Sequence, residues 1–156
     1  MKIPVSLLKN PVHLLSVGFG SGLAPKAPGT FGTIAALPIW YGLQFLPPAY
    51  YVLVLILAFV LGVYLCGATA DALGVHDHGG IVWDEFVGLW IALFMVPMHI
   101  TWIALGFVLF RLFDIWKPWP IRVLDAKVHG GFGIMIDDVL AGVYAYLVLQ
   151  LLYVMS

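Results

Sequence analysis

The sequence is poor in charge and in cysteine. Lysine, arginine, aspartate and glutamate make up 10% of its 156 residues, whereas soluble domains carry roughly 25%. A soluble globular domain is therefore not expected. The formal net charge of −1 provides no basic surface, so we expect no nucleic-acid partner. Cys66 is the single cysteine, which excludes a disulfide within the chain.

Apolar residues fill most of the remaining sequence, at 63% of the chain with a mean hydropathy of +1.05. They form five segments between polar or Gly- and Pro-rich stretches, at residues 30–46, 50–70, 83–96, 100–115 and 138–155. A bilayer core of roughly 30 Å needs about 20 helical residues, and residues 50–70 provide 21 without a charge. We therefore predict one all-α membrane domain over residues 1–156, with about five hydrophobic helices and four or five spans.

The distribution of charge along these segments predicts their orientation. If all five segments cross, the 7 basic and 8 acidic residues all lie on one side, because the loops near Pro47 and Pro97 and the last segment's far end carry none. Basic residues favour the cytoplasmic side, so we expect this side to face the cytoplasm. Trp83, Trp116 and Trp119 fit an aromatic belt at the same membrane surface.

Residues 110–138 concentrate the charge. Four of the seven basic and four of the eight acidic residues lie there, with a Pro-Trp-Pro turn and three glycines between Gly130 and Gly133. Charge in apolar surroundings must be paired or must bind an ion. This stretch therefore predicts a polar active site at one membrane face. We expect residues 130–133 to form a glycine-rich turn ahead of the last helix.

Acidic residues from separate segments converge on this face. Asp114 lies in the last turn of the fourth segment, where the helix dipole disfavours a carboxylate. It therefore needs a cation, and Arg111, Lys117 and a bound Mg²⁺ all qualify. The acid pairs at 84–85 and 137–138 each stand at an expected helix start, where one acid serves as a cap. Two adjacent acids at both places exceed what capping requires, which favours a metal site.

Basic residues provide candidates for binding an anion. Lys26, Arg111 and Lys117 are suited to phosphate, Arg through paired hydrogen bonds and Lys as a point charge. The loop histidines are more typical of surface or supporting positions than of metal ligands. These are His76, His78 and His129.

Four blocks of the sequence resemble a known family. They read PKAPGTFGT at 25–33, VWDEFVG at 82–88, FRLFDIWKPWP at 110–120 and GGFGIMIDDVLAG at 130–142. In this order, over roughly residues 16–145, they resemble phosphatidylglycerophosphatase A. Four separate blocks are far more specific than any single motif.

The resemblance implies a Mg²⁺-dependent enzyme of bacterial phospholipid synthesis. It would hydrolyse phosphatidylglycerophosphate to phosphatidylglycerol and phosphate at the inner membrane, so the expected partner is a membrane phospholipid substrate. We assign catalysis to five acids: Asp84, Glu85, Asp114, Asp137 and Asp138. The expected metal ligands among them are Asp84, Glu85, Asp114 and Asp138. The expected phosphate-binding residues are Lys26, Thr30, Thr33, Arg111 and Lys117. Second-tier candidates are Asp71, Asp77, Asp125 and His129.

An ion-coupled membrane transporter is the alternative. Acids within a membrane mark ion paths, and Pro38 could interrupt the first helix. Against this alternative, the acids cluster at one end of the segments and the far halves carry no charge. Metal-dependent phosphate release without a membrane gradient distinguishes the enzyme from the transporter.

Overall fold

The computed structural model describes residues 3–75 and 78–156, and over these residues the protein is helical without a strand. The all-α prediction is confirmed. Two 3-10 segments lie near the N-terminus, η1 (Val5–Lys9) and η2 (Gly18–Leu23). The α-helices are α1 (Pro11–Ser16), α2 (Pro28–Leu43), α3 (Pro48–Leu73), α4 (Trp83–Ala92), α5 (Ile100–Trp116), α6 (Ile121–Lys127) and α7 (Gly130–Met155).

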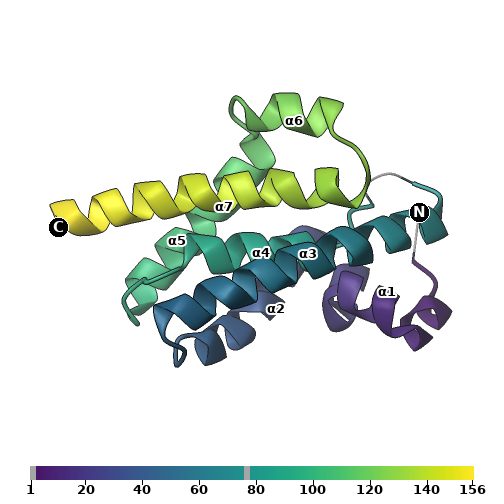
Figure 1. Cartoon of the computed structure of the whole chain (residues 1–156), viewed down its shortest axis with the longest axis horizontal. Coiled ribbons are helices and arrows are strands. Elements are labelled where there is room, and N and C mark those ends of the chain that lie inside the picture. Colours follow the sequence, from purple (N-terminus) through teal and green to yellow (C-terminus); the bar gives the residue numbers. More distant parts are fainter. Residues whose placement is uncertain (1–2, 76–77) are drawn as a thin grey trace.

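Helix α4 forms the centre of the bundle (Figure 1). It packs against α2, α3, α5 and α7, and nine of its ten residues are buried. The two longest helices, α3 and α7, contain 26 residues each and also pack against each other. The C-terminal end of α7 lies at one end of the long axis, and η1 and α1 lie near the other (Figure 1).

Proline, glycine and a histidine cap explain the bounds of the helices that match the sequence prediction. Helix α3 begins at Pro48 and ends before Gly74, which has a left-handed φ of 73° that glycine adopts without strain. Helix α5 begins after His99, whose Nδ1 accepts the N–H of Thr101 at 3.2 Å. It ends where Lys117 turns to a φ of 53° and Pro118 follows.

The expected glycine-rich turn at 130–133 is wrong, because these residues form the first turn of α7. Their glycines serve packing: a Cβ on Gly131 would lie 1.8 Å from the carbonyl oxygen of Val63 in α3. As a result, Asp137 and Asp138 stand about two turns inside α7 rather than at its start. Helix α6 was not predicted either, since seven residues carry too little periodicity to be recognised.

Two helices, α3 and α7, are long and apolar enough to cross a membrane, with mean hydropathies of 2.6 and 1.7 in their most apolar windows. Helices α2, α4 and α5 have 16, 10 and 17 residues. At about 1.5 Å per residue, each is shorter than a bilayer core of roughly 30 Å. Helices α3 and α7 are thus candidate spans by length and composition, and the four or five predicted spans are not confirmed.

Tryptophans of the core join the helices by hydrogen bonds from their indole N–H groups. Trp83 donates to the carbonyl of Ala58 at 3.0 Å, and Trp90 donates to that of Ala36 at 3.1 Å. Trp83 is buried, so its predicted place in an interfacial belt is wrong. Trp116 and Trp119 are exposed, as such a belt requires.

The N-terminal segment is tied to the bundle by hydrogen bonds near one end of α3. Ser16 Oγ donates to the carbonyl of Leu65 at 2.7 Å, and the N–H of Val82 donates to the carbonyl of Ser16 at 2.8 Å. Because Val82 immediately precedes α4, these bonds fix the entry of that helix relative to α1 and α3.

Close backbone contact between α4 and α7 depends on two glycines. A Cβ on Gly142 would lie 2.4 Å from the carbonyl oxygen of Gly88, and a Cβ on Gly88 would lie 2.8 Å from that of Asp138. Any side chain at either position would push the two helices apart. This contact brings the acids at the start of α4 beside those of α7.

We expect Gly142→Ala to lower the free energy of unfolding by about 1–3 kcal/mol, because the added methyl group overpacks the α4–α7 contact. Thermal unfolding in detergent measures the effect. Gly42→Ala in α2 is the matched control, since nothing lies within 4 Å of a Cβ there and alanine favours a helix. Equal unfolding temperatures for the two variants would contradict the packing role of Gly142.

Candidate active site

Five carboxylates meet in a buried pocket at one end of the bundle, and each is between 2% and 9% exposed. Asp84 and Glu85 lie in the first turn of α4, Asp114 in the last turn of α5, and Asp137 and Asp138 inside α7. Helix capping explains neither acid pair. Val82 is the cap residue of α4, and the pair in α7 lies beyond its first turn.

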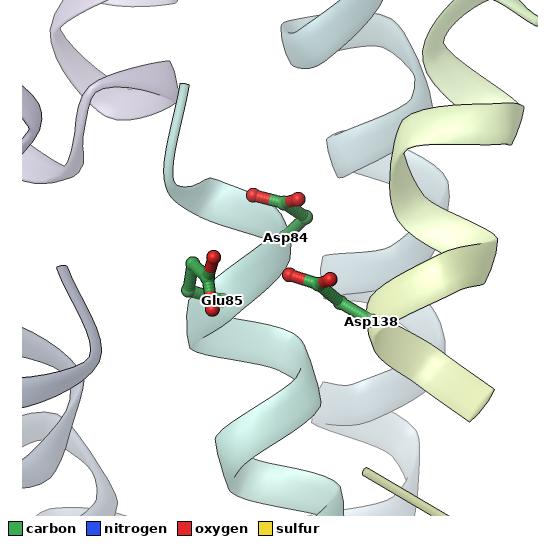
Figure 2. Close-up of side chains that lie close together, drawn as sticks. All are labelled: Asp84, Glu85 and Asp138. Carbon is green, nitrogen blue, oxygen red and sulfur yellow. The ribbon is translucent and has the colours of Figure 1, made fainter. Parts of the chain in front are cut away.

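Three of these acids form a candidate metal centre. Asp84 and Glu85 lie side by side on α4, and Asp138 extends toward them from α7 (Figure 2). One carboxylate oxygen from each lies within 4.8 Å of the others. Oδ2 of Asp138 is buried and has no hydrogen-bond partner among the described residues, which is costly unless a ligand satisfies it.

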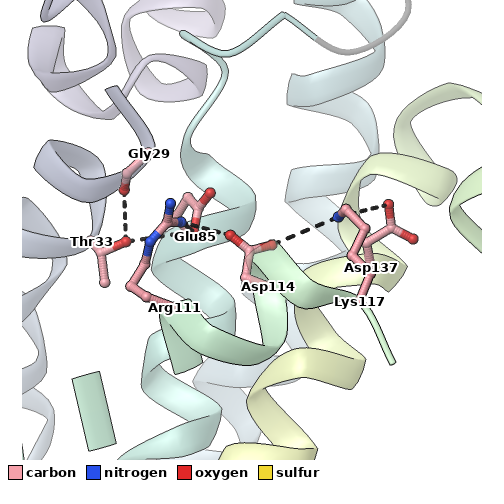
Figure 3. Close-up of polar contacts among 7 residues, drawn as sticks. All are labelled: Gly29, Thr33, Glu85, Arg111, Asp114, Lys117 and Asp137. Carbon is pink, nitrogen blue, oxygen red and sulfur yellow. Dashed lines mark hydrogen bonds and ion pairs between the residues drawn. The ribbon is translucent and has the colours of Figure 1, made fainter. Parts of the chain in front are cut away.

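Arg111 connects two of the acids from different helices. Its Nη1 donates to Oε2 of Glu85 at 2.9 Å and to Oδ2 of Asp114 at 2.6 Å (Figure 3). Thr33 Oγ1 lies 3.5 Å from the same Oε2 of Glu85 and donates to the carbonyl of Gly29 at 2.7 Å. The guanidinium therefore links α5 to α4, and α2 closes over the pair.

Lys117 provides the second cation, at 4.0 Å from Oδ1 of Asp114 and 3.9 Å from Oδ2 of Asp137. Partial burial lowers the pKa of Lys117, but the nearby carboxylates, Asp114 foremost, outweigh it and raise the pKa above its ordinary value. Lys117 is thus a cation at neutral pH. On the alkaline side, its ion pairs weaken as the pH rises through that raised pKa.

Acidic groups outnumber basic groups in the pocket. Five carboxylates line it, but Arg111 and Lys117 are its two strongly basic side chains. Buried negative charge of this kind is stabilised by a cation. Carboxylate oxygens are the ligands that Mg²⁺ prefers. The acid triad could therefore hold a divalent cation.

The pocket has a volume of about 320 Å³. Besides the charged residues, its wall consists of Ala27, Pro28, Gly29, His78, Gly79, Ile81 and Ile134. A Cβ on Gly29 would come within 3.1 Å of both Arg111 and Glu85. The glycine thus leaves room directly beside the guanidinium.

Seven of the sequence-predicted site residues line this pocket. These are Asp84, Glu85, Arg111, Asp114, Lys117, Asp137 and Asp138. Thr33 is fully buried behind the wall, with its hydroxyl proton directed to Gly29. Lys26 and Thr30 lie beside the pocket on the loop and first turn of α2, and neither lines it.

The second-tier candidates lie farther out. Asp71 is exposed and lines a different hollow between the end of α3 and the start of α7. Asp125, on α6, contributes to the field at Lys117. His129 is exposed ahead of α7, and Asp77 falls outside the described residues.

His78 is the wall residue that the sequence analysis did not rank. The structure brings it, half-buried, to the pocket that the acids of α4 and α7 also line. The available signal was the run His-Asp-His-Gly-Gly directly before the Asp84–Glu85 pair. Loop histidines are mostly superficial, so this run carried little weight.

Over the described residues, the fold and the site define an all-helical protein with a carboxylate-rich pocket that also contains Arg111 and Lys117. The chain belongs to the phosphatidylglycerophosphatase A family, whose model matches residues 14–153.

Three relatives support this membership. The Escherichia coli K12 phosphatidylglycerophosphatase A is 60% identical over 87% of this chain and 80% of its own length. The Haemophilus influenzae protein of the same name is 53% identical over 92% and 89%, respectively. A Bacteroides thetaiotaomicron protein, provisionally named a phosphatidylinositol-3-phosphatase, is 40% identical over 87% and 89%. No solved structure matches the chain.

Replacing Arg111 tests the electrostatics of this site. We expect Arg111→Met to lower the free energy of unfolding by about 3 kcal/mol, because Glu85 and Asp114 then lose the charge between them. Adding Glu85→Gln should recover part of the loss. Denaturant unfolding provides both values.

Arg122→Met is the control, because Arg122 is exposed and donates to the backbone carbonyl of Trp116. Its expected change lies within about 0.5 kcal/mol. If Arg111→Met is tolerated as well as the control, the two ion pairs contribute no stability.

Proposed function

We propose that this protein is a Mg²⁺-dependent lipid phosphatase that hydrolyses phosphatidylglycerophosphate to phosphatidylglycerol and inorganic phosphate. The family and the relatives' names provide the substrate. The observation that supports the chemistry is the triad of Asp84, Glu85 and Asp138 beside Arg111 and Lys117. Carboxylates next to fixed cations suit a site where a metal and a phosphate meet.

The acid triad would hold the metal. Asp84 and Glu85 enter from α4 and Asp138 from α7, so the ligands come from two helices whose spacing Gly88 and Gly142 fix. Asp114, which forms an ion pair with Arg111, stands next to this group and completes the acidic wall. A bound Mg²⁺ would polarise the phosphoryl group and lower the pKa of a bound water.

The basic residues would bind and neutralise the phosphate. Arg111 presents a planar guanidinium and Lys117 a point charge, and both line the pocket. Their charges oppose the negative charge that spreads over the phosphoryl oxygens in the transition state. Ile81 and Ile134 provide apolar wall that excludes bulk water and strengthens these interactions.

We further propose that the protein is a multi-pass protein of the bacterial inner membrane with its site facing the cytoplasm. Helices α3 and α7 would span, and α2 and α5 would tilt little or cross where the bilayer is thin. Enclosed α4 would carry the acids into the bundle. The one-sided charge of the sequence and the positive-inside rule support this orientation.

An ion-coupled transporter fits less well. The five buried acids gather at a single pocket. Beyond Asp138, α7 carries no further charge through Met155, and neither does α3 from Pro48 up to Asp71. Charged groups within a membrane mark ion paths, and these stretches of the two helices carry none.

The first experiment measures phosphate release from phosphatidylglycerophosphate by protein purified in detergent, with and without Mg²⁺. We expect Mg²⁺-dependent release by the wild type and at least a 100-fold lower kcat/KM for Asp114→Asn, because that change removes charge beside Arg111 and the triad. Asp71→Asn should retain activity, since Asp71 lies outside the pocket. Full activity of Asp114→Asn would show that the Asp114 carboxylate takes no part in catalysis. No phosphate release by folded wild type would refute the proposed enzymatic activity.

Thermal unfolding tests the metal site without catalysis. We expect Mg²⁺ at about 100 times its Kd to stabilise the wild type by about 2.7 kcal/mol. Asp138→Asn should abolish that response and should raise the unfolding temperature without metal, because it removes one of the five buried acidic groups that crowd the pocket. Asp71→Asn should respond like the wild type. An unchanged Mg²⁺ response in Asp138→Asn would place the ion elsewhere.

A further inference from the structure

A second, larger cavity adjoins the polar pocket. It has a volume of about 600 Å³ and lies between the N-terminal segment and the loop before α4. Its wall consists of Ile3, Val5, Gly22, Leu23, Ala24, Pro25, Pro28, His78, Gly79 and Gly80. Pro28, His78 and Gly79 also line the polar pocket, so the two cavities share one wall.

The two cavities differ sharply in chemistry. The acids and the two strong bases belong to the polar pocket, whereas the second cavity has no charged side chain in its wall apart from what His78 can carry. His78 Nδ1 accepts the N–H of Gly80 at 2.9 Å. Its ring proton in the neutral form is therefore on Nε2, which makes His78 a hydrogen-bond donor at the shared wall.

Backbone contacts hold the second cavity in shape. A Cβ on Gly22 would lie 1.9 Å from the carbonyl oxygen of Gly80, so η2 and the loop before α4 touch through their main chains. The N–H of Ile81 donates to the carbonyl of His78 at 2.9 Å, which closes the turn that carries the histidine. The cavity is thus a feature of packed backbone and not a gap between loose loops.

Lys26 stands at the rim between the two cavities. It is exposed and lies between Pro25, which lines the apolar cavity, and Ala27, which lines the polar pocket. A lysine has a long flexible stem and a point charge. From this position its ammonium can reach an anion that passes from one cavity to the other.

We propose that the apolar cavity binds the glyceride portion of the lipid substrate while the polar pocket holds its terminal phosphate. This inference rests on the proposed function. Phosphatidylglycerophosphate carries, in order, a phosphate monoester, a glycerol, a phosphodiester and a diacylglycerol. The polar pocket, the shared wall with His78, the rim with Lys26 and the apolar cavity present matching surfaces in that order.

The arrangement assigns a role to each side of the wall. The monoester bond that is cleaved lies near Pro28, His78 and Gly79, with the phosphorus on the acidic side. The negatively charged phosphodiester lies near Lys26. The first carbons of the acyl chains leave water and contact Ile3, Leu23 and Pro25. The cavity therefore selects a lipid over a soluble phosphate ester.

Cysteine labelling tests the occupant directly, because the natural Cys66 is fully buried. Ala24→Cys places a thiol in the wall of the apolar cavity. Ala49→Cys, exposed at the opposite end of α3, is the matched control. The rate of maleimide labelling is measured in detergent with and without dihexanoyl phosphatidylglycerol, kept below its micelle-forming concentration, and separately with inorganic phosphate.

We expect the short-chain lipid to slow labelling of Ala24→Cys at least threefold, with no effect on Ala49→Cys, and inorganic phosphate to slow neither. Equal labelling of Ala24→Cys with and without the lipid, or equal protection at both positions, would overturn the proposal. This readout does not require turnover. An inactive wild type that still shows protection would refute the proposed function and leave the lipid site standing.

Ala24→Phe, which fills the cavity, provides a second test by kinetics. We expect the inhibition constant of dihexanoyl phosphatidylglycerol, as product, to rise about tenfold, while that of inorganic phosphate stays within twofold. Ala49→Phe should change neither constant. A parallel rise of both constants, or no rise in either, would show that the apolar cavity does not take the lipid portion.

Discussion

Arg111 Nη1 lies 2.9 Å from Oε2 of Glu85 and 2.6 Å from Oδ2 of Asp114, and so joins α5 to α4 inside an apolar bundle. Without a cation at this point, carboxylates from three helices could not share one pocket, since each would face like charges with little water to screen them. One guanidinium and Lys117 do not balance five acids. In the proposed function, a divalent cation would offset this excess of acidic groups and, with the two bases, would form the binding site for phosphate.

The same geometry depends on glycines, which have no side chain to keep the helices apart. Gly88 and Gly142 let the backbones of α4 and α7 touch, and Gly131 lets α7 touch α3. Gly29 keeps space open beside Arg111. Larger residues would leave each helix intact but would separate the acids of α4 from those of α7. Site geometry and helix packing are therefore one property of this fold.

The sequence predicted the parts of the structure that follow from local chemistry. Prolines and an unbroken apolar run defined α3, and acids recurring at segment ends predicted that α4, α5 and α7 would meet. It did not predict that Asp137 and Asp138 lie inside α7. The glycines before them pack against Val63, and without knowledge of that contact a run of glycines predicts a turn. The place of His78 likewise depends on a loop whose path only the tertiary contacts determine.

The depth of the acids has a consequence for how a lipid would be handled. Asp137 follows Gly130 by seven residues, which is about 10 Å along a helix. In the proposed orientation, the substrate phosphate must leave the hydrated interface to reach them, and its lost hydration is offset by Arg111, Lys117 and the bound cation. A soluble anion gains those contacts but nothing from the apolar cavity beside them. Depth and the two adjoining cavities thus favour an amphiphilic substrate, because it alone gains on both sides of the shared wall.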